Sequence, residues 1–572
     1  MNNEQVMPVN ETQPGGGLKR FLAVYQVPLL TLAVFICGAV LLGAFHKNMM
    51  PGPDLSGQLQ AASHLGAGHG YSITAPLSAN CLVQGPEFRR QVLWPPFLSY
   101  AVALGLRFGL SHSLALLAVT LPFLALGSWG WVRLAGRVVG RGWLLFLFAA
   151  IVAINCVPTR HTWTHSDIML WSLAPLWTLA WMKCLDRGEQ QYLWPALLAG
   201  LLGVVAAGFR YQAVSWIAAA GLLALLRTNW QERVKAGLAG ALPPAVVLGG
   251  IWGANKVWGT SPFSSNIASR RLWYEFWNWN WYRVQPILSL EQFFTKPTGL
   301  IWVRQRLTAG LHPGVDLWEH PLKLLFAVIT ILGTVAVCCA FARAKKKNLS
   351  LVAGAGYLTT FGMLTFLAVS STGSAPLITA RHHPWYRYYA WFTPIAALGC
   401  VLLVRQLRKE LPRAVWWAGV GGVTLLLIAS GVSWFNLTMG QWRSAFNREE
   451  ERRSLHVLQR LDEASKRLCV ITPQSRRIKW TGIETYRLPS DEVCRQLSEQ
   501  RRRMYERAEA GELTLLVVDK KDGGQPNPEV SVSRVVQELE LVPHGRLPDG
   551  RLLYGFPATR VKVMSVAGIS PE

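Results

Sequence analysis

The sequence predicts an α-helical polytopic membrane protein with about eleven transmembrane helices, followed by a small C-terminal α/β domain. Of its 572 residues, 51% are hydrophobic and 26 are tryptophan, a composition unlike that of a soluble globular protein. Several apolar runs reach about 18 residues, enough to cross about 30 Å of hydrocarbon. The net charge of +25 comes from Lys and Arg clusters between these runs, as the positive-inside rule expects of cytoplasmic loops. This placement argues against nucleic acid as a partner.

Eleven apolar segments, interpreted as spans, put every basic cluster on one side of the membrane. Residues 1–20 form a polar cytoplasmic tail ending at Lys19 and Arg20, so the N-terminus is expected inside. The stretch 95–109 is only about 15 residues long and is interpreted as an interfacial helix, because a crossing there would move most basic loops outside. The predicted spans are 21–45, 111–132, 143–157, 168–182, 192–207, 213–226, 237–257, 321–341, 349–369, 389–404 and 414–434.

This topology gives a membrane domain over residues 21–440 with two large outer loops, 46–110 and 258–320. Residues 441–572 then lie outside the membrane. We expect a multi-pass integral protein of a bacterial inner or plasma membrane, with the N-terminus in the cytoplasm and the C-terminal domain extracytoplasmic.

Helix and strand patterns alternate in the C-terminal domain. A charged helix over 448–467 leads to the apolar run LCVIT, and a second helix over 491–510 leads to LTLLVV. A third short helix and a strand pair between Pro543 and Phe556 complete an α/β pattern. Cys469 and Cys494 could form a disulfide in an oxidising compartment, or remain two buried thiols.

Two carboxylates on the outer side are candidates for chemistry. Asp54 follows the first span in PGPDLSG, where it is either the N-cap of the next helix or a general base or metal ligand at the membrane surface. Asp167 ends the cluster TRHTWTHSD at the mouth of the fourth span, where a carboxylate needs a partner. The same cluster holds His161 and His165, whose spacing of four is a weak sign of a metal site.

Basic residues on the outer side run against the charge bias of the chain. Arg210 lies between the fifth and sixth spans, and the loop after the ninth span holds Arg381, His382, His383 and Arg387. An arginine presents a planar fork that stays charged, so an anionic lipid phosphate in the outer leaflet is a natural ligand. The alternative is contact with ordinary phospholipid headgroups.

Aromatic residues are concentrated in LWYEFWNWNWY, residues 272–282. Such a run is typical of an interfacial belt. Because tryptophan faces also stack on sugar rings, a carbohydrate-binding surface is the alternative interpretation.

Together these features resemble the GT-C superfamily of membrane glycosyltransferases, and most of all the branch of protein O-mannosyltransferases and of the aminoarabinose transferases that modify lipid A. The resemblance covers about residues 20–440 and rests on order and spacing. Five features mark that branch, in chain order. They are an early acidic residue in the first outer loop, an AxxLxxGxGY-like segment, a Pro-Pro helix start, a second outer acidic residue and a late Arg-Tyr element. The matching residues here are Asp54, ASHLGAGHGY (62–71, which includes His69), WPPF (94–97), HSD (165–167) and Arg387-Tyr388.

The resemblance implies an inverting transferase that moves a sugar from a polyprenyl-phosphate donor to a hydroxyl of an acceptor glycan, lipid or protein. Asp54 would act as general base and Asp167 would orient the acceptor or a basic partner. The implied ligands of the lipid phosphate and sugar are Arg210, Arg381, His382, His383, Arg387, Tyr388, His165 and His69.

One departure from the family pattern bears on metal use. Many relatives have an adjacent acidic pair in the first loop, whereas Asp54 is followed by Leu55. This favours a base that works without a metal ion, although a divalent cation stays open as a cofactor.

Two other functions compete with a transferase. A lipid-linked glycan ligase or transporter is the first, but a transporter should carry charges inside its spans, and only Arg210 comes near such a position. The second is a membrane anchor that presents the C-terminal domain to a partner, which leaves the charged outer loops unexplained.

Overall fold

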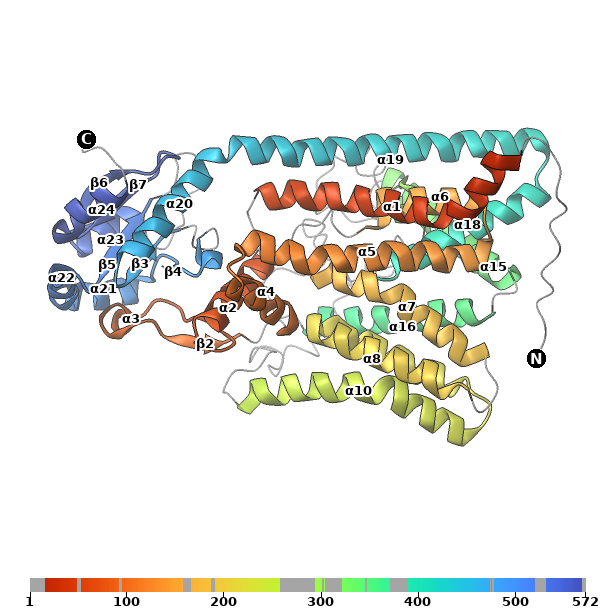
Figure 1. Ribbon diagram of the computed structural model, residues 1–572, viewed down its shortest axis with the longest axis horizontal. Coiled ribbons are helices and arrows are strands. Elements are labelled where there is room, and N and C mark those ends of the chain that lie inside the picture. The colour runs from red at the N-terminus through yellow and green to blue at the C-terminus, as the bar shows by residue number, and fades with distance from the viewer. Residues whose placement is uncertain are drawn as a thin grey trace.

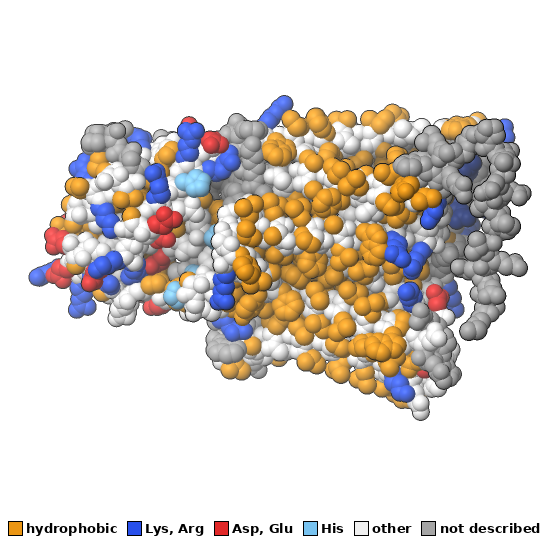
Figure 2. All heavy atoms as spheres, in the orientation of Figure 1, with side chains coloured by type: hydrophobic (Ala, Val, Ile, Leu, Met, Phe, Trp, Pro, Cys, Tyr) orange, Lys and Arg blue, Asp and Glu red, His pale blue; other side chains and the backbone are white. Residues whose placement is uncertain are grey.

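The computed structural model describes residues 16–48, 53–91, 95–157, 166–186, 191–257, 294–300, 303, 321–344, 347–370, 389–473, 475, 478–519 and 531–567. Figure 1 shows long helices running roughly along the long axis of the molecule, with a unit of short helices and strands at one end. Side chains on the face drawn in Figure 2 are mainly hydrophobic over the helices and mixed with charges over that end unit. A bundle with such an apolar exterior is an integral membrane protein.

Each of the eleven segments predicted as spans coincides with a helix. These are α1 (Gly16–Asn48), α5 (His112–Val139), α6 (Trp143–Ile151) with its π-helical extension (Val152–Cys156), α7 (Ser166–Asp186), α8 (Leu193–Phe209), α9 (Val214–Leu225), α10 (Trp230–Val257), α15 (Pro321–Arg343), α16 (Lys347–Ser370), α18 (Thr393–Glu410) and α19 (Arg413–Asn447). Within the described residues, six helices are long and apolar enough to cross a membrane, whereas α6, α8 and α9 are apolar but shorter. Eleven crossings therefore stay a prediction.

The first outer loop folds into short elements at the end of the bundle next to the C-terminal unit (Figure 1). They are α2 (Pro53–Gly66), β1 (Ser72–Thr74), α3 (Ala79–Gln84), β2 (Phe88–Arg90) and α4 (Phe97–Arg107). The interfacial helix expected over 95–109 is α4, which packs on α2 and α5. Because α2 begins at Pro53, Asp54 lies inside its first turn, so the N-cap interpretation of Asp54 is wrong.

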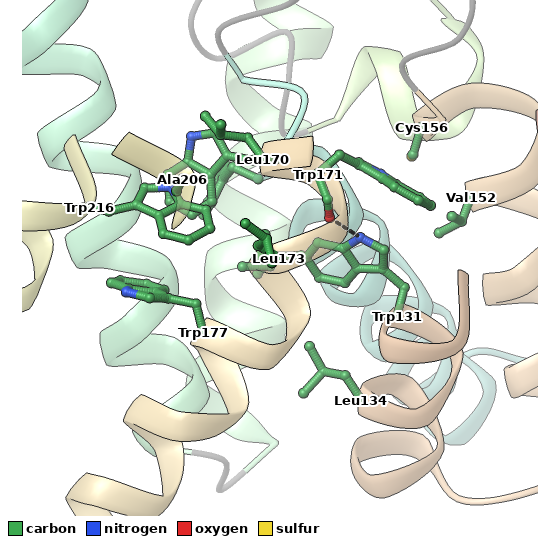
Figure 3. Close-up of a cluster of buried hydrophobic side chains, with 14 of the residues drawn as sticks. Trp131, Leu134, Val152, Cys156, Leu170, Trp171, Leu173, Trp177, Ala206 and Trp216 are labelled. Atoms are coloured by element: carbon green, nitrogen blue, oxygen red, sulfur yellow. Dashed lines mark hydrogen bonds between the residues drawn. The ribbon is translucent and has the colours of Figure 1, made fainter. Parts of the chain in front are cut away.

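Close contact between α5 and α7 holds the centre of the bundle together. A Cβ at Gly127 would lie 2.5 Å from the Trp171 ring, and one at Gly130 would lie 2.6 Å from Pro175, so only glycine fits at either position. Around this contact lies a group of tryptophans that are each less than 2% exposed, namely Trp131, Trp171, Trp177, Trp181, Trp216 and Trp391. Figure 3 shows Trp131 pointing from α5 toward the Trp171 backbone.

Pro175 explains why Trp131 points toward the Trp171 backbone. Pro175 has no N–H, so within α7 the carbonyl of Trp171 loses its usual donor four residues later. The Trp131 indole N–H donates to this carbonyl at 3.0 Å, as the dashed line in Figure 3 shows. In a bilayer an orphaned carbonyl costs several kcal/mol, so this side chain stabilises the proline-containing helix.

The C-terminal unit, residues 448–567, contains a five-stranded sheet of order β4-β3-β5-β7-β6. Its strands are β3 (Leu468–Ile471), β4 (Glu484–Tyr486), β5 (Thr514–Val518), β6 (Val542–Arg546) and β7 (Leu552–Gly555). Strand β3 is parallel to both β4 and β5, and β7 is antiparallel to β5 and β6. Every residue of β3 and β5 is buried, on both faces of the sheet. This is expected of central strands in a sheet that helices cover on both faces.

Helices of this unit differ in detail from the pattern in the sequence. They are α20 (Glu449–Ala464), α21 (Asp491–Glu499), α22 (Arg501–Glu509), α23 (Val532–Glu538) and α24 (Arg560–Ala567). The single helix predicted over 491–510 is wrong, because the chain breaks at Gln500 into two helices. Strand β4 and helix α24 were not predicted. Cys469 and Cys494 are both free and buried, in keeping with the thiol interpretation.

The first outer loop contributes to the core of the C-terminal unit. Leu77, Cys81 and Leu82, on or next to α3, lie in one hydrophobic cluster with β3, β5 and α21. Arg467 adds polar bonds to the same contact, because its guanidinium donates to the carbonyl oxygens of Cys81 and Leu82 at 2.5 and 3.1 Å. The unit is therefore anchored on the loop that begins with α2.

Candidate functional site

A buried ion pair joins the adjacent ends of α7 and α8. Asp167 is the second residue of α7, where the helix dipole favours a carboxylate. Arg210 follows the last residue of α8 in an extended conformation (φ −150°, ψ 133°), which ends the helix. An Arg210 guanidinium nitrogen lies 2.8 Å from an Asp167 carboxylate oxygen, and the two side chains are only 1% and 3% exposed. The partner that Asp167 was expected to need is Arg210.

Burial of this pair has a physical consequence. Neither charge would be tolerated alone in so dry a setting, because the desolvation penalty of a single ion is several kcal/mol. Held together, they fix a guanidinium at a defined place near the end of the bundle. The Arg210 guanidinium is thus fixed in one position by Asp167, unlike a mobile arginine at the surface.

A second polar chain connects the neighbouring turn to the first outer loop. The Asn255 side-chain amide, at the end of α10, donates to the Tyr211 hydroxyl at 3.3 Å. The Asn255 amide oxygen in turn accepts a hydrogen bond from Arg90 Nε at 3.0 Å. Arg90 belongs to β2, so elements from three separate parts of the chain meet through Asn255 at Tyr211, the residue after Arg210.

Tyr71 borders the same cluster from the first outer loop. Burial, and then the nearby Tyr211, raises the pKa of the Tyr71 phenol, whereas a hydrogen bond with Ser99 opposes the shift. A tyrosine phenol is protonated at neutral pH even at its ordinary pKa of about 10, so Tyr71 can act as a donor.

The Pro-Pro helix start packs directly on the Arg210-bearing turn. Phe97, the first residue of α4, makes an edge-to-face contact with Phe209, with ring centroids 5.9 Å apart. A Cβ at Gly208 would overlap the Phe97 ring, so a glycine is required there for the two elements to meet. This contact places the start of α4 next to the turn that carries Arg210.

Helix α2, which carries Asp54 in its first turn, is fastened to the same group of elements. Ser99 of α4 donates to the carbonyl oxygen of Gln58 at 2.8 Å. A Cβ at Gly57 would lie 3.0 Å from the side-chain nitrogen of Gln91, just beyond β2. The Asp54 side chain itself lies outside the described residues.

His69 belongs to a different cluster. It is exposed and stacks on Phe88 with ring centroids 4.3 Å apart. Its neighbour His64 is buried and lies 3.2 Å from the Ser72 hydroxyl. Burial, followed by the charge of His69, lowers the pKa of His64 to about 4. No contact recorded among the described side chains joins His69 to Asp167 or Arg210.

Several predicted site residues lie outside the described residues, so their roles stay predictions. They are Arg381, His382, His383, Arg387, Tyr388, His161 and His165, together with the aromatic segment 272–282. In the part of the chain that the structure does describe, no group of three His, Cys, Asp or Glu side chains could hold a metal ion. Asp54, His161 and His165 are not among those described side chains.

Sequence reasoning assigned no role to Arg90, Asn255 or Tyr211, and it included Tyr71 only as the last residue of the ASHLGAGHGY segment. Arg90 carried a usable signal, because the pair Arg89-Arg90 lies in a predicted outer loop and so runs against the charge bias, as Arg210 does. Asn255 and Tyr211 carried none, since a single polar residue at the end of an apolar segment is common.

Comparison with protein-family models and with curated proteins finds no match. Among solved structures, the chain is similar to ArnT from Cupriavidus metallidurans bound to undecaprenyl phosphate, with 14% identity and a TM-score of 0.46 over 96% of this chain and 100% of that chain. The apo state of the same ArnT gives 15% identity and a TM-score of 0.44 with the same coverage. The oligosaccharyltransferase of Archaeoglobus fulgidus in its apo form gives 12% and 0.46, over 88% of this chain and 70% of that one.

Proposed function

We propose that this protein is a membrane glycosyltransferase that moves a sugar from a polyprenyl-phosphate donor to an acceptor hydroxyl, with inversion, on the outer face of the membrane. The observation that supports it best is the buried Asp167–Arg210 pair, 2.8 Å apart, with Phe97 of the loop that carries Asp54 packed on the adjoining Phe209. The donor is of the class of lipid phosphate that one of the similar ArnT structures contains.

The proposed reaction uses one base and fixed positive charge. The acceptor oxygen attacks the anomeric carbon while the Asp54 carboxylate takes its proton. The bond from that carbon to the phosphate oxygen breaks, and its electron pair leaves with the polyprenyl phosphate. Arg210 stabilises the negative charge that grows on this leaving group, because its position is set by Asp167 before the reaction begins.

Arg90 and Tyr71 extend the positive and donor surface toward the first outer loop. Arg90 is held by Asn255 at 3.0 Å, and the Tyr71 phenol is a hydrogen-bond donor at neutral pH, as any protonated tyrosine is. Both suit recognition of a phosphate or of sugar hydroxyls. We assign them to binding of the donor headgroup.

The test uses purified protein in detergent and a panel of polyprenyl-phosphate sugars with candidate acceptors. Release of polyprenyl phosphate is measured for wild type, Asp54→Asn and Arg210→Gln, with and without a chelator. Asp186→Asn, an exposed carboxylate at the other end of α7, is the matched control. We expect release by wild type and the control, and a large loss in both site variants.

The other outcomes also have a meaning. Donor binding with no release under any condition would contradict the transferase and favour the lipid-linked glycan transporter. Loss of release on chelation would show that a divalent cation takes part.

A further inference from the structure

We propose that a groove at the end of the bundle opposite Asp167 binds an anionic phospholipid of the inner leaflet. The groove has a volume of about 520 Å³ and lies between α5, α7 and α8. Asp167 and Lys183 lie near opposite ends of α7, which at about 1.5 Å per residue separates them by roughly 24 Å. The groove is thus distinct from the proposed transferase site and does not depend on that function.

One part of the groove wall is aliphatic. Leu176 and Leu179 line it from α7, and Leu198 and Leu202 line it from α8. Leu198 is 51% exposed, so the wall is open to whatever lies beside the bundle. A hydrocarbon chain is the natural occupant of an apolar cleft that faces the membrane interior, and the volume falls within the usual range of about 300–1,000 Å³ for ligand sites.

Three cations lie at the groove. Arg133 and Arg137 are one helical turn apart on α5, and Lys183 faces them from α7. All three are exposed, and none forms an ion pair with a carboxylate among the described residues. Arg227, by contrast, is buried and bound to Glu232 at 2.8 Å. Positive charge at the groove is therefore left for an external anion.

Two tryptophans indicate that this anion is a lipid headgroup rather than free phosphate. Trp129 and Trp194 line the groove, 37% and 76% exposed, as tryptophans do at the level of lipid headgroups. The Arg133 guanidinium lies 4.8 Å from the Trp129 ring centroid, which holds its charge at that level. Figure 2 shows basic side chains gathered at this end of an otherwise apolar face. Phosphate and acyl chain can thus be bound together, as basic pockets between spans do on the cytoplasmic side.

Native mass spectrometry of the detergent-purified protein tests the site. Phosphatidylglycerol and phosphatidylethanolamine are added in equal amounts, and the retained lipid is counted for each variant. We expect wild type to retain phosphatidylglycerol at least about tenfold better than phosphatidylethanolamine, and the triple variant Arg133→Gln/Arg137→Gln/Lys183→Gln to lose that preference. The control Lys235→Gln/Lys409→Gln/Arg413→Gln removes three other exposed cations and should keep it.

A steric variant keeps the test decisive if the triple variant does not fold. Leu198→Trp fills the groove without changing charge and should lower retention, whereas Leu238→Trp, at an equally exposed position of α10, should not. Equal retention of the two phospholipids by wild type would overturn the proposal. So would unchanged retention in Leu198→Trp, or stronger retention of undecaprenyl phosphate than of phosphatidylglycerol.

Discussion

The Asp167–Arg210 pair is stable only while both of its members are present. Its side chains are 1% and 3% exposed, so removal of either charge leaves the other buried. We expect Asp167→Asn to lower the free energy of unfolding by about 3–5 kcal/mol. Thermal unfolding in detergent measures this, with Asp186→Asn expected within about 0.5 kcal/mol of wild type.

The double variant Asp167→Asn/Arg210→Gln separates pairing from packing. It removes both charges, so it should be more stable than either single variant. Single variants that unfold at the wild-type temperature would contradict the account of this pair.

His64 gives the first outer loop a defined pH dependence. Its pKa of about 4 in the folded protein is below the ordinary 6.5, chiefly because the ring is buried. The unfolded chain therefore binds the proton more readily, and stability falls as the pH drops from 6.5 toward 4. Wild type should lose more thermal stability between pH 7 and pH 5 than His64→Gln does.

The exposed His456→Gln variant is the matched control and should follow wild type. If His64→Gln and wild type lose the same stability over that pH range, burial of His64 is not what sets it.

The sequence identified Asp167 and Arg210 as candidate site residues, but it did not predict that they contact each other. Asp167 was singled out because a carboxylate there needs a partner, and Arg210 because it was predicted on the outer side, against the charge bias. Nothing in their spacing links them, since they meet only where α7 packs against α8. Arg90 and Asn255 are joined in the same way, by tertiary contact alone.

At the scale of elements, Pro175 and Trp131 form one unit. Trp131→Phe removes the donor to the Trp171 carbonyl and should destabilise the bundle by about 1–3 kcal/mol. Pro175→Ala returns an N–H to α7, so the double variant should lose less stability than Trp131→Phe alone. The exposed Trp417→Phe serves as control in thermal unfolding. A double variant that shows the full sum of both losses would be evidence against this reading of the helix.

Helices of the bundle were predictable because an apolar run in lipid can satisfy its backbone polar groups only as a helix. Their ends were less so. Helix α5 continues to Val139, past the predicted end at 132, because hydrogen bonding along the backbone does not stop where hydropathy falls. Strand β4 is only three residues long and pairs with β3, so the sequence around it carries no alternating pattern to find.

At the scale of the whole molecule, Arg467 joins the C-terminal unit to the first outer loop. Its guanidinium bonds Glu484 at 2.8 and 2.7 Å in addition to the carbonyls of Cys81 and Leu82. We expect Arg467→Met to raise hydrogen exchange in α3, because charged hydrogen bonds of about 1.5–3 kcal/mol each are lost. Arg460→Met, on the exposed face of α20, should leave exchange in α3 unchanged. Equal exchange in both variants would mean that the Arg467 bonds do not hold the loop, leaving that role to the hydrophobic contacts and the hydrogen bond from Gln500 to Asn80 at 3.0 Å.

The most direct test of the transferase is a single-turnover comparison of wild type with Asp54→Asn, both loaded with the same polyprenyl-phosphate sugar. Donor binding and release of polyprenyl phosphate are measured separately. A general base contributes about 10²–10⁴-fold to such a rate, so we expect binding to be kept and release to fall by that factor. Release by Asp54→Asn at the wild-type rate would contradict the central claim.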